Sequence, residues 1–305
     1  MPALRAKQVV GKTKGEYMSL EVSVKELLEA GAHFGHQVSR WNPKMRPYIF
    51  TTKGGIHIMD LEQTTHAIQR AYQFVVETVA LGNQVLFVGT KKQARNLIES
   101  EAKRAGQFYV NNRWLGGMLT NFKTIKASID RMINLEKQAA SPDFEKFTKK
   151  ERLNMEREII KLNSVLGGIK TMTRLPGCLF IIDPKKEDIA KKEAKRLKIP
   201  VVAIVDTNCD PDGIDYVIPA NDDAIRSIQI VTKAITDACE EGARRRQAQL
   251  AKEQQLPEGA EKPTASPFNT EKEVKGKGKA YVGTLKVDAV EDPAVEQYAS
   301  AKAKE

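Results

Sequence analysis

The chain has 305 residues, and its 49 Lys and Arg outnumber its 39 Asp and Glu to give a formal net charge of +10. This basic excess favours a phosphate-rich partner such as nucleic acid, with a soluble basic enzyme as the alternative. The composition argues against a membrane span, which needs roughly 20 apolar residues in a row. It also argues against a disulfide framework, because Cys178, Cys209 and Cys239 are far apart, so we expect a cytoplasmic protein.

The N-terminal third is irregular. Residues 1–17 are predicted to form a basic flexible arm, with Met18 as a second candidate for the first residue. Ser23 is a suitable N-cap for a helix over 24–30, which Gly31 would end. From residue 32 to 65 we expect a loop-rich region with short strands, one of them at 55–59.

Strands and helices then alternate along the chain. Helices are predicted at 64–82, 91–105, from Pro184 to about 197, and from Asn221 or Asp222 to Gly242. Short apolar strands are predicted at 84–89, 108–110, 178–182, 201–205 and 216–218. Strands separated by helices indicate an α/β fold, a doubly wound parallel sheet of about five strands.

An insertion separates the two halves of this domain. Residues 122–138 and 146–166 carry apolar residues at helical spacing, with a turn at 141–143, which predicts an antiparallel helical hairpin. The predicted division is an α/β domain over 18–121 and 167–243, a hairpin over 122–166, and a mostly disordered polar tail over 244–305. The hairpin's apolar stripes favour its own seam over a partner site. Deleting residues 123–165 should therefore leave a folded sheet domain.

The stretch 110–124 is the strongest indication of nucleic-acid binding. It combines the donors Asn111, Asn112 and Arg113 with the indole of Trp114, a flat face for a base or sugar, and with two glycines. Such a mixture suits an irregular RNA surface better than a small-molecule pocket.

A second stretch, 40–50, again mixes cations with aromatic residues. Its cations Arg40, Lys44 and Arg46 would attract phosphates. Trp41 either stacks on an unpaired base or packs the loop onto the core, and Phe50 is expected in the core.

Residues 88–93 follow a predicted strand and open a predicted helix. A helix N-terminus there, helped by Lys91 and Lys92, would suit an RNA phosphate, with solvated lysines as the alternative. The segment is not a Walker loop, because Gly-x-x-x-x-Gly-Lys is absent.

The competing hypothesis is a metal- or nucleotide-dependent enzyme on the same sheet, using His33, His36, Asp60 and Asp206. Asp206 would follow a strand, where α/β folds place catalytic groups, but residues 206–213 also suit a turn-rich loop. The histidine spacing matches no specific metal motif, so we predict no metal site, no cofactor and no catalytic residue.

Several stretches together resemble one family, the second protein of the bacterial small ribosomal subunit. They occur in the family's order over about 18–243 and comprise residues 31–36, 41–45, 87–91, 112–121, 166–170, 204–208, 210–213 and 218–226. The arm before Met18 and the tail after about Gln247 are longer than the family's usual core.

The resemblance implies a flavodoxin-like domain with a protruding helical hairpin, a coiled coil, in a protein that is not an enzyme. It implies binding to 16S ribosomal RNA between the head and body of the subunit. It further implies neighbouring small-subunit proteins as partners and support for the first small-subunit protein near the messenger RNA exit. A membrane and a small-molecule substrate are not expected. With the Trp41 loop, the Trp114 loop and the hairpin as RNA-facing parts, the residues predicted to bind RNA are His36, Arg40, Trp41, Lys44, Arg46, Lys91, Lys92, Asn111, Asn112, Arg113, Trp114, Lys123 and Arg131.

Overall fold

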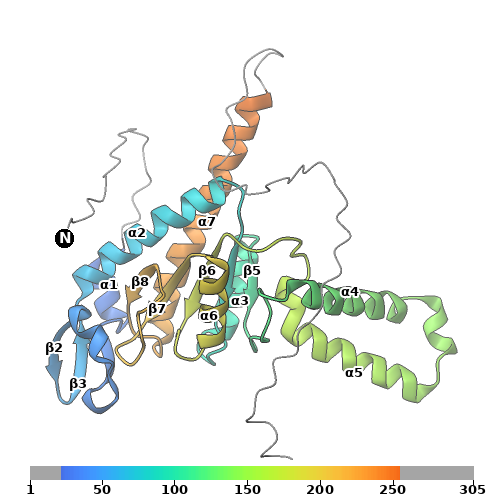
Figure 1. The fold of residues 1–305 in the computed structure, drawn as a ribbon, viewed down its shortest axis with the longest axis horizontal. Helices are drawn as coiled ribbons and strands as arrows, with labels where there is room; N and C mark the ends of the chain where they lie inside the picture. Colours follow the sequence, from blue (N-terminus) through green and yellow to red (C-terminus); the bar gives the residue numbers. More distant parts are fainter. Residues whose placement is uncertain (1–21, 255–305) are drawn as a thin grey trace, which may run out of the picture. The chain divides into compact units, whose positions relative to one another are not determined.

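Five short apolar strands form a parallel sheet at the centre of the domain (Figure 1). The structure, a computed structural model, describes residues 22–254, so the predictions for the arm, for Met18 and for the tail from 255 onward lie outside the described residues. The strands are β4 (Val85–Val88), β5 (Phe108–Val110), β6 (Cys178–Ile182), β7 (Val201–Val205) and β8 (Tyr216–Pro219). They lie in the order β5-β4-β6-β7-β8. This is the 2-1-3-4-5 order of flavodoxin-like folds, so the predicted fold class is confirmed.

Helices cover both faces of this sheet, which explains why the strands are apolar at nearly every position. Phe87 and Phe180 belong to one apolar cluster, with α2 (Leu61–Ala80), α3 (Arg95–Arg104) and α7 (Ile225–Gln254). Leu86 and Leu179, one residue earlier in each strand, belong to the opposite cluster with α6 (Asp188–Leu197). The alternation follows from the two-residue period of a strand.

The N-terminal region adds a small antiparallel sheet in the order β1-β3-β2. Its elements are α1 (Val24–Glu29), β1 (Phe34–Gln37), β2 (Ile49–Lys53) and β3 (Ile56–Met59), with 3-10 turns at Val38–Arg40 and Pro43–Tyr48. Ser23 is the N-cap of α1, as the sequence predicted, and it forms a capping box with Glu26. The prediction that Phe50 lies in the core is wrong, because Phe50 is 75% exposed on β2.

Several helices begin at other residues than predicted; α5 (Lys149–Leu166) begins at Lys149 and α7 at Ile225. Helix α2 begins at Leu61, because the Asp60 side chain accepts hydrogen bonds from the backbone of Glu62 and Gln63. Helix α3 begins at Arg95, since residues 91–94 form a turn. Helix α6 begins at Asp188 after a turn over 184–187.

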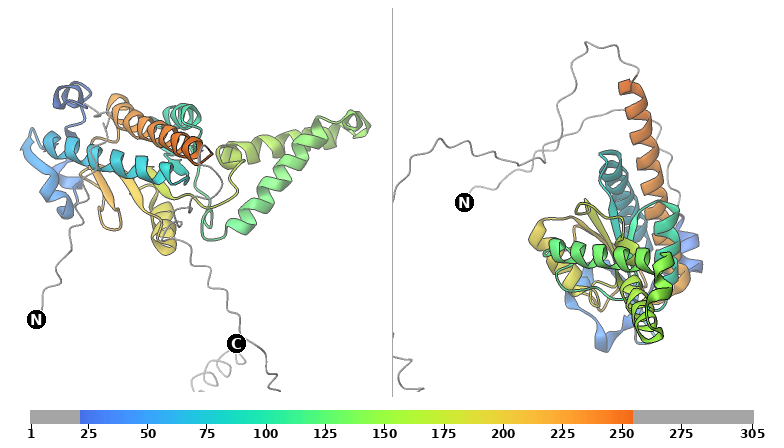
Figure 2. Two further views of the ribbon diagram at one scale, coloured as in Figure 1. Left: turned by 90° about the horizontal axis from the view of Figure 1, so that it is seen from above. Right: turned by 90° about the vertical axis from the view of Figure 1, so that its right-hand side faces the viewer.

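Helix α7 continues well past Gly242, where the sequence predicted its end. Gly242 lies against α2, and a Cβ atom there would come within 2.7 Å of the backbone oxygen of Val76. The glycine therefore permits close helix packing instead of ending the helix. Helices α2 and α7 run side by side (Figure 2). The prediction of disorder from 244 is wrong for residues 244–254, which are helical.

The insertion forms two helices, α4 (Phe122–Ala139) and α5 (Lys149–Leu166), joined by a 3-10 turn over Pro142–Lys146. A capping box of Thr148 and Glu151 begins α5. The pair packs together and extends away from the sheet (Figure 1). Its coiled-coil character and the division of the chain into domains stay predictions.

The base of the hairpin belongs to the domain core. Ile125, Ile129 and Met132 of α4 and Leu166 of α5 lie in the same apolar cluster as strands β4 and β6. The distal part of α5 is more exposed, with Leu153 and Ile160 at 45% and 69%.

Within the described segment 22–254, none of the helices combines the length and the apolar character required to cross a bilayer.

Candidate nucleic-acid interface

The loops that leave the carboxyl ends of the parallel strands carry six of the thirteen residues predicted to bind RNA. Lys91 follows β4, the 111–121 loop follows β5, and Asp206 follows β7. From β4 the chain goes first to β5 on one side and then to β6 on the other, so the switch point of the sheet lies between β4 and β6. Open α/β sheets bind their ligands at such a switch point. The sheet topology therefore brings residues from distant parts of the chain to one edge.

The loop after β5 is organised by one buried carboxylate, that of Glu193 on α6. Its two oxygens accept hydrogen bonds from the Trp114 indole (3.1 Å) and from the backbone N–H groups of Gly117, Leu119 and Thr120 at 2.7, 2.9 and 3.0 Å. Burial acts to raise the pKa of Glu193, but these donors outweigh it and hold the pKa below its usual value. Sequence reasoning missed Glu193, because nothing in the pattern of α6 distinguishes it from a solvated glutamate.

This clamp contradicts the stacking role predicted for Trp114. The side chain is 6% exposed and packs in the same cluster as Met118 and Leu119. Its indole N–H donates a hydrogen bond to the Glu193 carboxylate. Trp114 therefore shapes the loop from inside, and no face of its ring is available to a base.

Two pockets along this edge bring together cations from several loops. Arg95, Asn112, Arg113 and Lys186 line the first pocket, together with Thr90, Trp114, Glu187 and Ile189. Arg40, Trp41, Lys185 and Lys191 line the second, together with Asn42, Pro43, Pro184, Asp188, Asn208 and Asp210. The β6–α6 loop contributes to both pockets, so it connects the 111–121 loop with the 38–48 loop. Lys185 and Lys186 were missed, although they follow a predicted strand.

Five of the predicted cations are exposed and make no ion pair with any residue between 22 and 254. They are Arg40, Arg46, Lys92, Arg113 and Lys123. Unpaired, solvated cations are the groups that can exchange their counterions for phosphates. Trp41 lies beside Arg40, is half-buried, and contacts the His57 ring at 4.9 Å between centroids.

Three other predicted residues already have partners. The Lys44 ammonium lies 3.0 Å from Asp210 and 2.5 Å from Asp212. Asn111 donates to Glu99 at 2.9 Å, and Arg131 pairs with Glu158 at 2.7 Å across the hairpin. These contacts stabilise the loops and the hairpin but reduce the attraction of these groups for phosphate.

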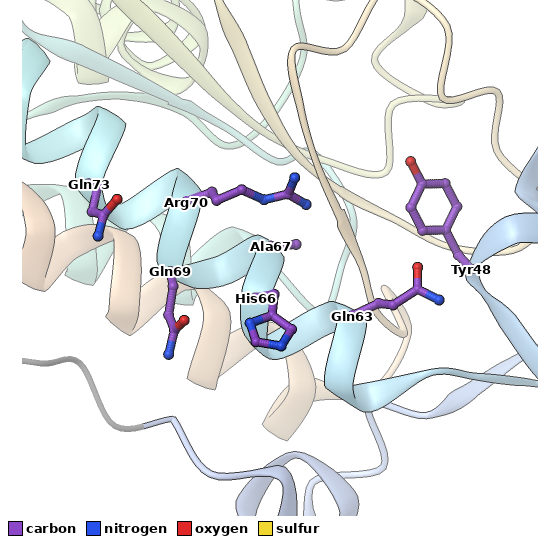
Figure 3. Close-up of a pocket in the computed structure, with 7 residues that line it drawn as sticks. All are labelled: Tyr48, Gln63, His66, Ala67, Gln69, Arg70 and Gln73. Atoms are coloured by element: carbon purple, nitrogen blue, oxygen red, sulfur yellow. The ribbon is translucent and has the colours of Figure 1, made fainter. Parts of the chain in front are cut away.

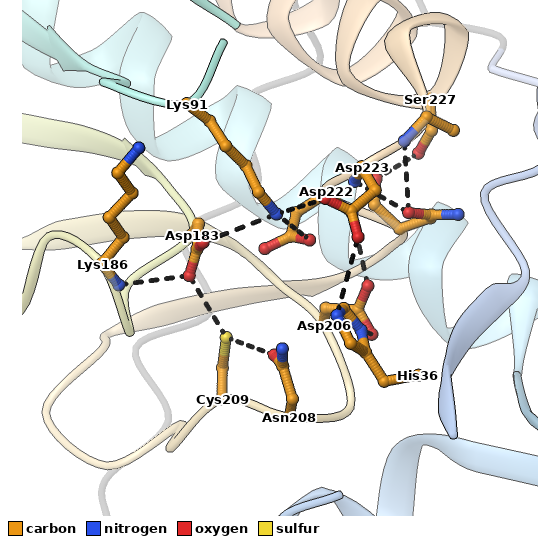
Figure 4. Close-up of polar contacts among 12 residues, drawn as sticks. His36, Lys91, Asp183, Lys186, Asp206, Asn208, Cys209, Asp222, Asp223 and Ser227 are labelled. Carbon is orange, nitrogen blue, oxygen red and sulfur yellow. Dashed lines mark hydrogen bonds and ion pairs between the residues drawn. The ribbon is translucent and has the colours of Figure 1, made fainter. Parts of the chain in front are cut away.

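His36 and Lys91 lie in an acidic cluster (Figure 4), which argues against their predicted contact with RNA. Lys91 contacts Asp222 and Asp223, both at 2.7 Å, and Asp183 at 3.5 Å. Burial opposes the charge of Lys91, but the hydrogen bond to Asp222 and the neighbouring carboxylates raise its pKa well above the ordinary value. A phosphate would be repelled by these carboxylates.

His36 faces the same carboxylates. Its Nδ1 atom lies 3.0 Å from Asp206 and its Nε2 atom 3.6 Å from Asp223. The hydrogen bond to Asp206 raises the pKa of His36, against the opposing effect of burial. Asp222 is fully buried, and burial together with the charges of Asp206 and Asp183 raises its pKa to about 7.

The phosphate position predicted at 88–93 is occupied by the protein itself. The backbone N–H and hydroxyl of Thr90 donate to Glu187 at 3.1 and 2.5 Å. Since the helix begins only at Arg95 and a buried carboxylate takes these donors, the prediction of a helix-terminus phosphate site is wrong.

The four residues of the enzyme hypothesis do not form one site. His36 and Asp206 meet in the acidic cluster. Asp60 instead caps α2, and the His33 ring contacts the Phe34 ring in a tilted arrangement. A further pocket (Figure 3) lies along α2 and contains none of the residues predicted for either hypothesis; Tyr48, Gln63, His66, Ala67, Gln69, Arg70 and Gln73 line it.

Comparison with known proteins gives a consistent family. A family model described as Ribosomal protein S2 matches residues 27–242. The Small ribosomal subunit protein uS2 of Roseiflexus castenholzii is 63% identical over 227 residues, covering 74% of this chain and 86% of that protein. The protein of the same description from Geotalea uraniireducens is 58% identical over 240 residues, covering 79% and 93%. The one from Chloroflexus aurantiacus is 58% identical over 226 residues, covering 74% and 95%.

The match extends over the parallel sheet, the hairpin and nearly all the loops at the carboxyl edge. It decides against the metal- or nucleotide-dependent enzyme and confirms the resemblance on which the fold was predicted. The chain belongs to the ribosomal protein S2 family, a family of ribosomal proteins and not of enzymes.

Proposed function

We propose that this protein is a structural component of the small ribosomal subunit and binds 16S ribosomal RNA through the carboxyl edge of its parallel sheet. The observation that carries the proposal is the set of cations without an ion pair in the two pockets at that edge, Arg40, Arg113 and Lys185, in a chain similar to Small ribosomal subunit protein uS2. The RNA-binding group comprises Arg40, Trp41, Arg46, Lys92, Asn112, Arg113, Lys123, Lys185 and Lys186. We call this group the basic rim.

The chemistry of the basic rim suits a folded RNA. Arginine guanidinium groups bind phosphates through a planar fork of donors, and lysines add charge without geometric demands. Charged side chains from several loops line both pockets, and the β6–α6 loop is shared between them, which favours an irregular backbone over a small ligand. Helices α4 and α5 offer a second basic surface, because Lys149, Lys150 and Lys161 are exposed on α5.

Within the subunit, we propose a position between the head and the body, near the messenger RNA exit, in a cytoplasmic ribosome. There the protein supports docking of the first small-subunit protein and contacts other neighbouring proteins. The support for these finer statements is the resemblance to the family and the relatives' description as small-subunit proteins.

Gradient sedimentation of a cell lysate at low and high magnesium tests the proposal. The protein should migrate with the small subunit at both concentrations and with joined ribosomes at high magnesium. Rising salt should release it gradually, because binding depends on counterion release. Recovery only in the light soluble fractions, at moderate salt, would overturn the proposal.

Matched variants test the basic rim itself. Two single variants, Arg113→Gln and Lys185→Gln, should each bind more weakly to subunits that lack the protein. In each, the slope of log K against log salt should fall by about 1 for the phosphate that is no longer neutralised. Lys233→Gln on α7, an exposed lysine outside both pockets, is the control and should leave the slope unchanged. An unchanged slope for both rim variants would remove these residues from the interface.

A further inference from the structure

A pocket of about 550 Å³ lies at the amino ends of three adjacent strands, on the edge of the sheet opposite the basic rim. Gln84 directly precedes β4, Gln107 directly precedes β5, and Thr173 and Arg174 lie in the loop that leads to β6. Arg246 reaches the same pocket from α7, which runs along α2 to this edge (Figure 2). None of the residues predicted to bind RNA lines this pocket.

Two guanidinium groups meet at Gly82, the residue after the C-cap of α2. Arg174 donates a hydrogen bond to the carbonyl oxygen of Gly82. A Cβ atom on Gly82 would overlap with the guanidinium group of Arg246. Gly82 also has a φ of 85°, in the left-handed region that favours glycine. Because Gly82 has no side chain, both cations can lie against the end of α2.

The packing of α7 on α2 places Arg246. Gly242 lies where the two helices approach most closely, and Arg246 follows it by four residues on the same face of α7. The guanidinium group of Arg246 is therefore directed to the end of α2 by the helix pair itself. Arg174, in contrast, comes from the loop that joins the hairpin to β6.

Neither arginine has an acidic partner between residues 22 and 254. The carboxylates of the preceding turns of α7 pair with other cations. Asp237 and Glu240 contact Arg104, each at 2.7 Å. Glu241 contacts Arg245 at 2.9 Å. No aspartate or glutamate of the described segment lines the pocket, so an anion between the two guanidinium groups would meet attraction from both.

An alternative is that both arginines only cap helices. Helices α2 and α3 end at this pocket, and cations are favoured at helix C-termini. Arg174 fits this role, because it serves the Gly82 carbonyl. Arg246 does not, because its guanidinium group donates no hydrogen bond to any residue of the segment 22–254. Capping therefore accounts for Arg174 and leaves the donors of Arg246 available to a ligand.

We propose that Arg174 and Arg246 bind a phosphate group of RNA at the amino edge of the sheet. Guanidinium groups bind phosphate through paired donors. Asn83 and Gln247 line the same pocket, are exposed, and can bond to a ribose or a base. Leu250, 44% exposed, adds an apolar wall that a free phosphate ion would not use.

This contact is additional to the basic rim, and it rests on the proposed function only in taking RNA as the partner. The two edges are separated by the length of a strand, about 13 Å for four residues, so one phosphate cannot serve both. RNA bound at both edges would hold the sheet domain from two sides.

Binding of a fluorescein-labelled, single-stranded RNA of mixed sequence to the full-length, untagged chain tests the site. Fluorescence anisotropy at several salt concentrations gives the slope of log K against log salt. Arg174→Gln and Arg246→Gln should each bind more weakly, and each should lower the slope by about 0.7, the value for one phosphate of a single strand. A slope for Arg246→Gln equal to that of the unmodified chain would overturn the proposal.

The matched control is Arg244→Gln. Arg244 is an exposed arginine of the same helix, lies 3.7 Å from Glu240 and does not line the pocket. Its replacement should leave the slope unchanged. A lower Tm for Arg174→Gln with unchanged slopes for both pocket variants would show that the arginines only cap helices.

Modification by phenylglyoxal, which reacts with accessible guanidinium groups, gives a second test that requires no variant to fold. With RNA about tenfold above its dissociation constant, modification of Arg174 and Arg246 should slow about tenfold, while that of Arg244 should not change. Mass spectrometry reads each site separately. Equal protection by inorganic phosphate at the same phosphate concentration would overturn the assignment to RNA.

Arg113 reports the basic rim in the same experiment, so the two ideas can fail separately. Protection of Arg113 without protection of Arg246 would overturn this inference and leave the basic rim standing. Protection of Arg246 without protection of Arg113 would support this inference and remove Arg113 from the proposed interface.

Discussion

At the scale of single residues, Glu193 decides the form of the 111–121 loop. Its carboxylate accepts the Trp114 indole and the backbone N–H groups of Gly117, Leu119 and Thr120. Hydrogen bonds to a charged acceptor are stronger than those between neutral groups. The loop that presents Arg113 is therefore held from beneath by a side chain 79 positions further along than Trp114.

Glu193→Gln tests this clamp. The amide keeps the shape but loses the charge and turns an N–H group toward backbone donors, so we expect a loss of about 2–3 kcal/mol in the free energy of unfolding. Urea denaturation measures the loss. Glu156→Gln, an exposed position on α5, is the control and should change stability by less than about 0.5 kcal/mol.

The same variant should change how stability depends on pH. Because the folded-state pKa of Glu193 is lowered, its stabilisation is present above the unfolded-state pKa, roughly 4.3, and is lost as pH falls through the folded-state pKa. The deficit of Glu193→Gln should thus be largest near neutral pH and shrink in acid. A constant deficit between pH 7 and pH 3 would contradict the lowered pKa.

At the scale of elements, the α2–α7 pair depends on Gly242. A Cβ atom there would lie 2.7 Å from both the Val76 backbone oxygen and the Val79 Cβ atom. The long C-terminal helix can therefore lie closely along α2 only where it lacks a side chain.

Gly242→Ala should destabilise the protein by about 1–3 kcal/mol through forced separation of the two helices, although alanine is the better helix former by about 1 kcal/mol. Thermal unfolding measures the effect. Gly116→Ala is the matched control, since a Cβ atom there would meet nothing within 4 Å. Greater stability of Gly242→Ala would show that α7 does not pack this closely.

The hairpin is an element of two parts. Its base contributes Ile125, Ile129, Met132 and Leu166 to the domain core. This placement argues against the expectation that deleting 123–165 leaves a folded sheet domain, because that deletion removes three buried side chains.

Removing only the distal part of the hairpin tests its role in subunit binding without disturbing the folding of the domain. Replacing residues 134–158 by a short Gly/Ser linker keeps the buried base, and we expect a change of less than about 1 kcal/mol in unfolding free energy. Under the proposed function, subunit binding should fall, because Arg152, Arg157 and neighbouring basic residues are removed. Full subunit binding by a folded truncated protein would exclude a role for the distal hairpin.

At the scale of the whole molecule, two apolar clusters, one on each face of the sheet, hold the described residues together. All three cysteines are free and buried. Cys178 and Cys239 lie in the cluster formed by α2, α3 and α7. Burial raises the pKa of both thiols above the ordinary value, which suppresses the reactive thiolate.

Alkylation of Cys178 and Cys239 should therefore require global unfolding. We expect their labelling in the native protein to be slower than in the denatured protein by the unfolding equilibrium constant, on the order of 10³ or more. Mass spectrometry after pulsed labelling across a urea series measures this. Rapid native labelling of Cys239 would show that α7 opens independently of the sheet.

The sequence by itself determined the elements and their class. Apolar runs such as Val85–Val88 and the N-cap Ser23 depend on local chemistry, so they were predictable and the structure confirms them. The family could also be recognised from the sequence, because its characteristic stretches occur in order along the chain.

Only the tertiary structure decided which predicted residues are available for binding. Arg113 and Lys91 are both cations beside strand ends, yet Arg113 is exposed and Lys91 contacts three aspartates. Trp114 is an aromatic residue in a polar loop, yet Glu193 and the core enclose it. Burial and charge pairing depend on neighbours that strand order brings together, and those neighbours lie up to 131 positions away in the case of Lys91 and Asp222. Local patterns carry no information about such contacts, so the fold was predictable and the site was not.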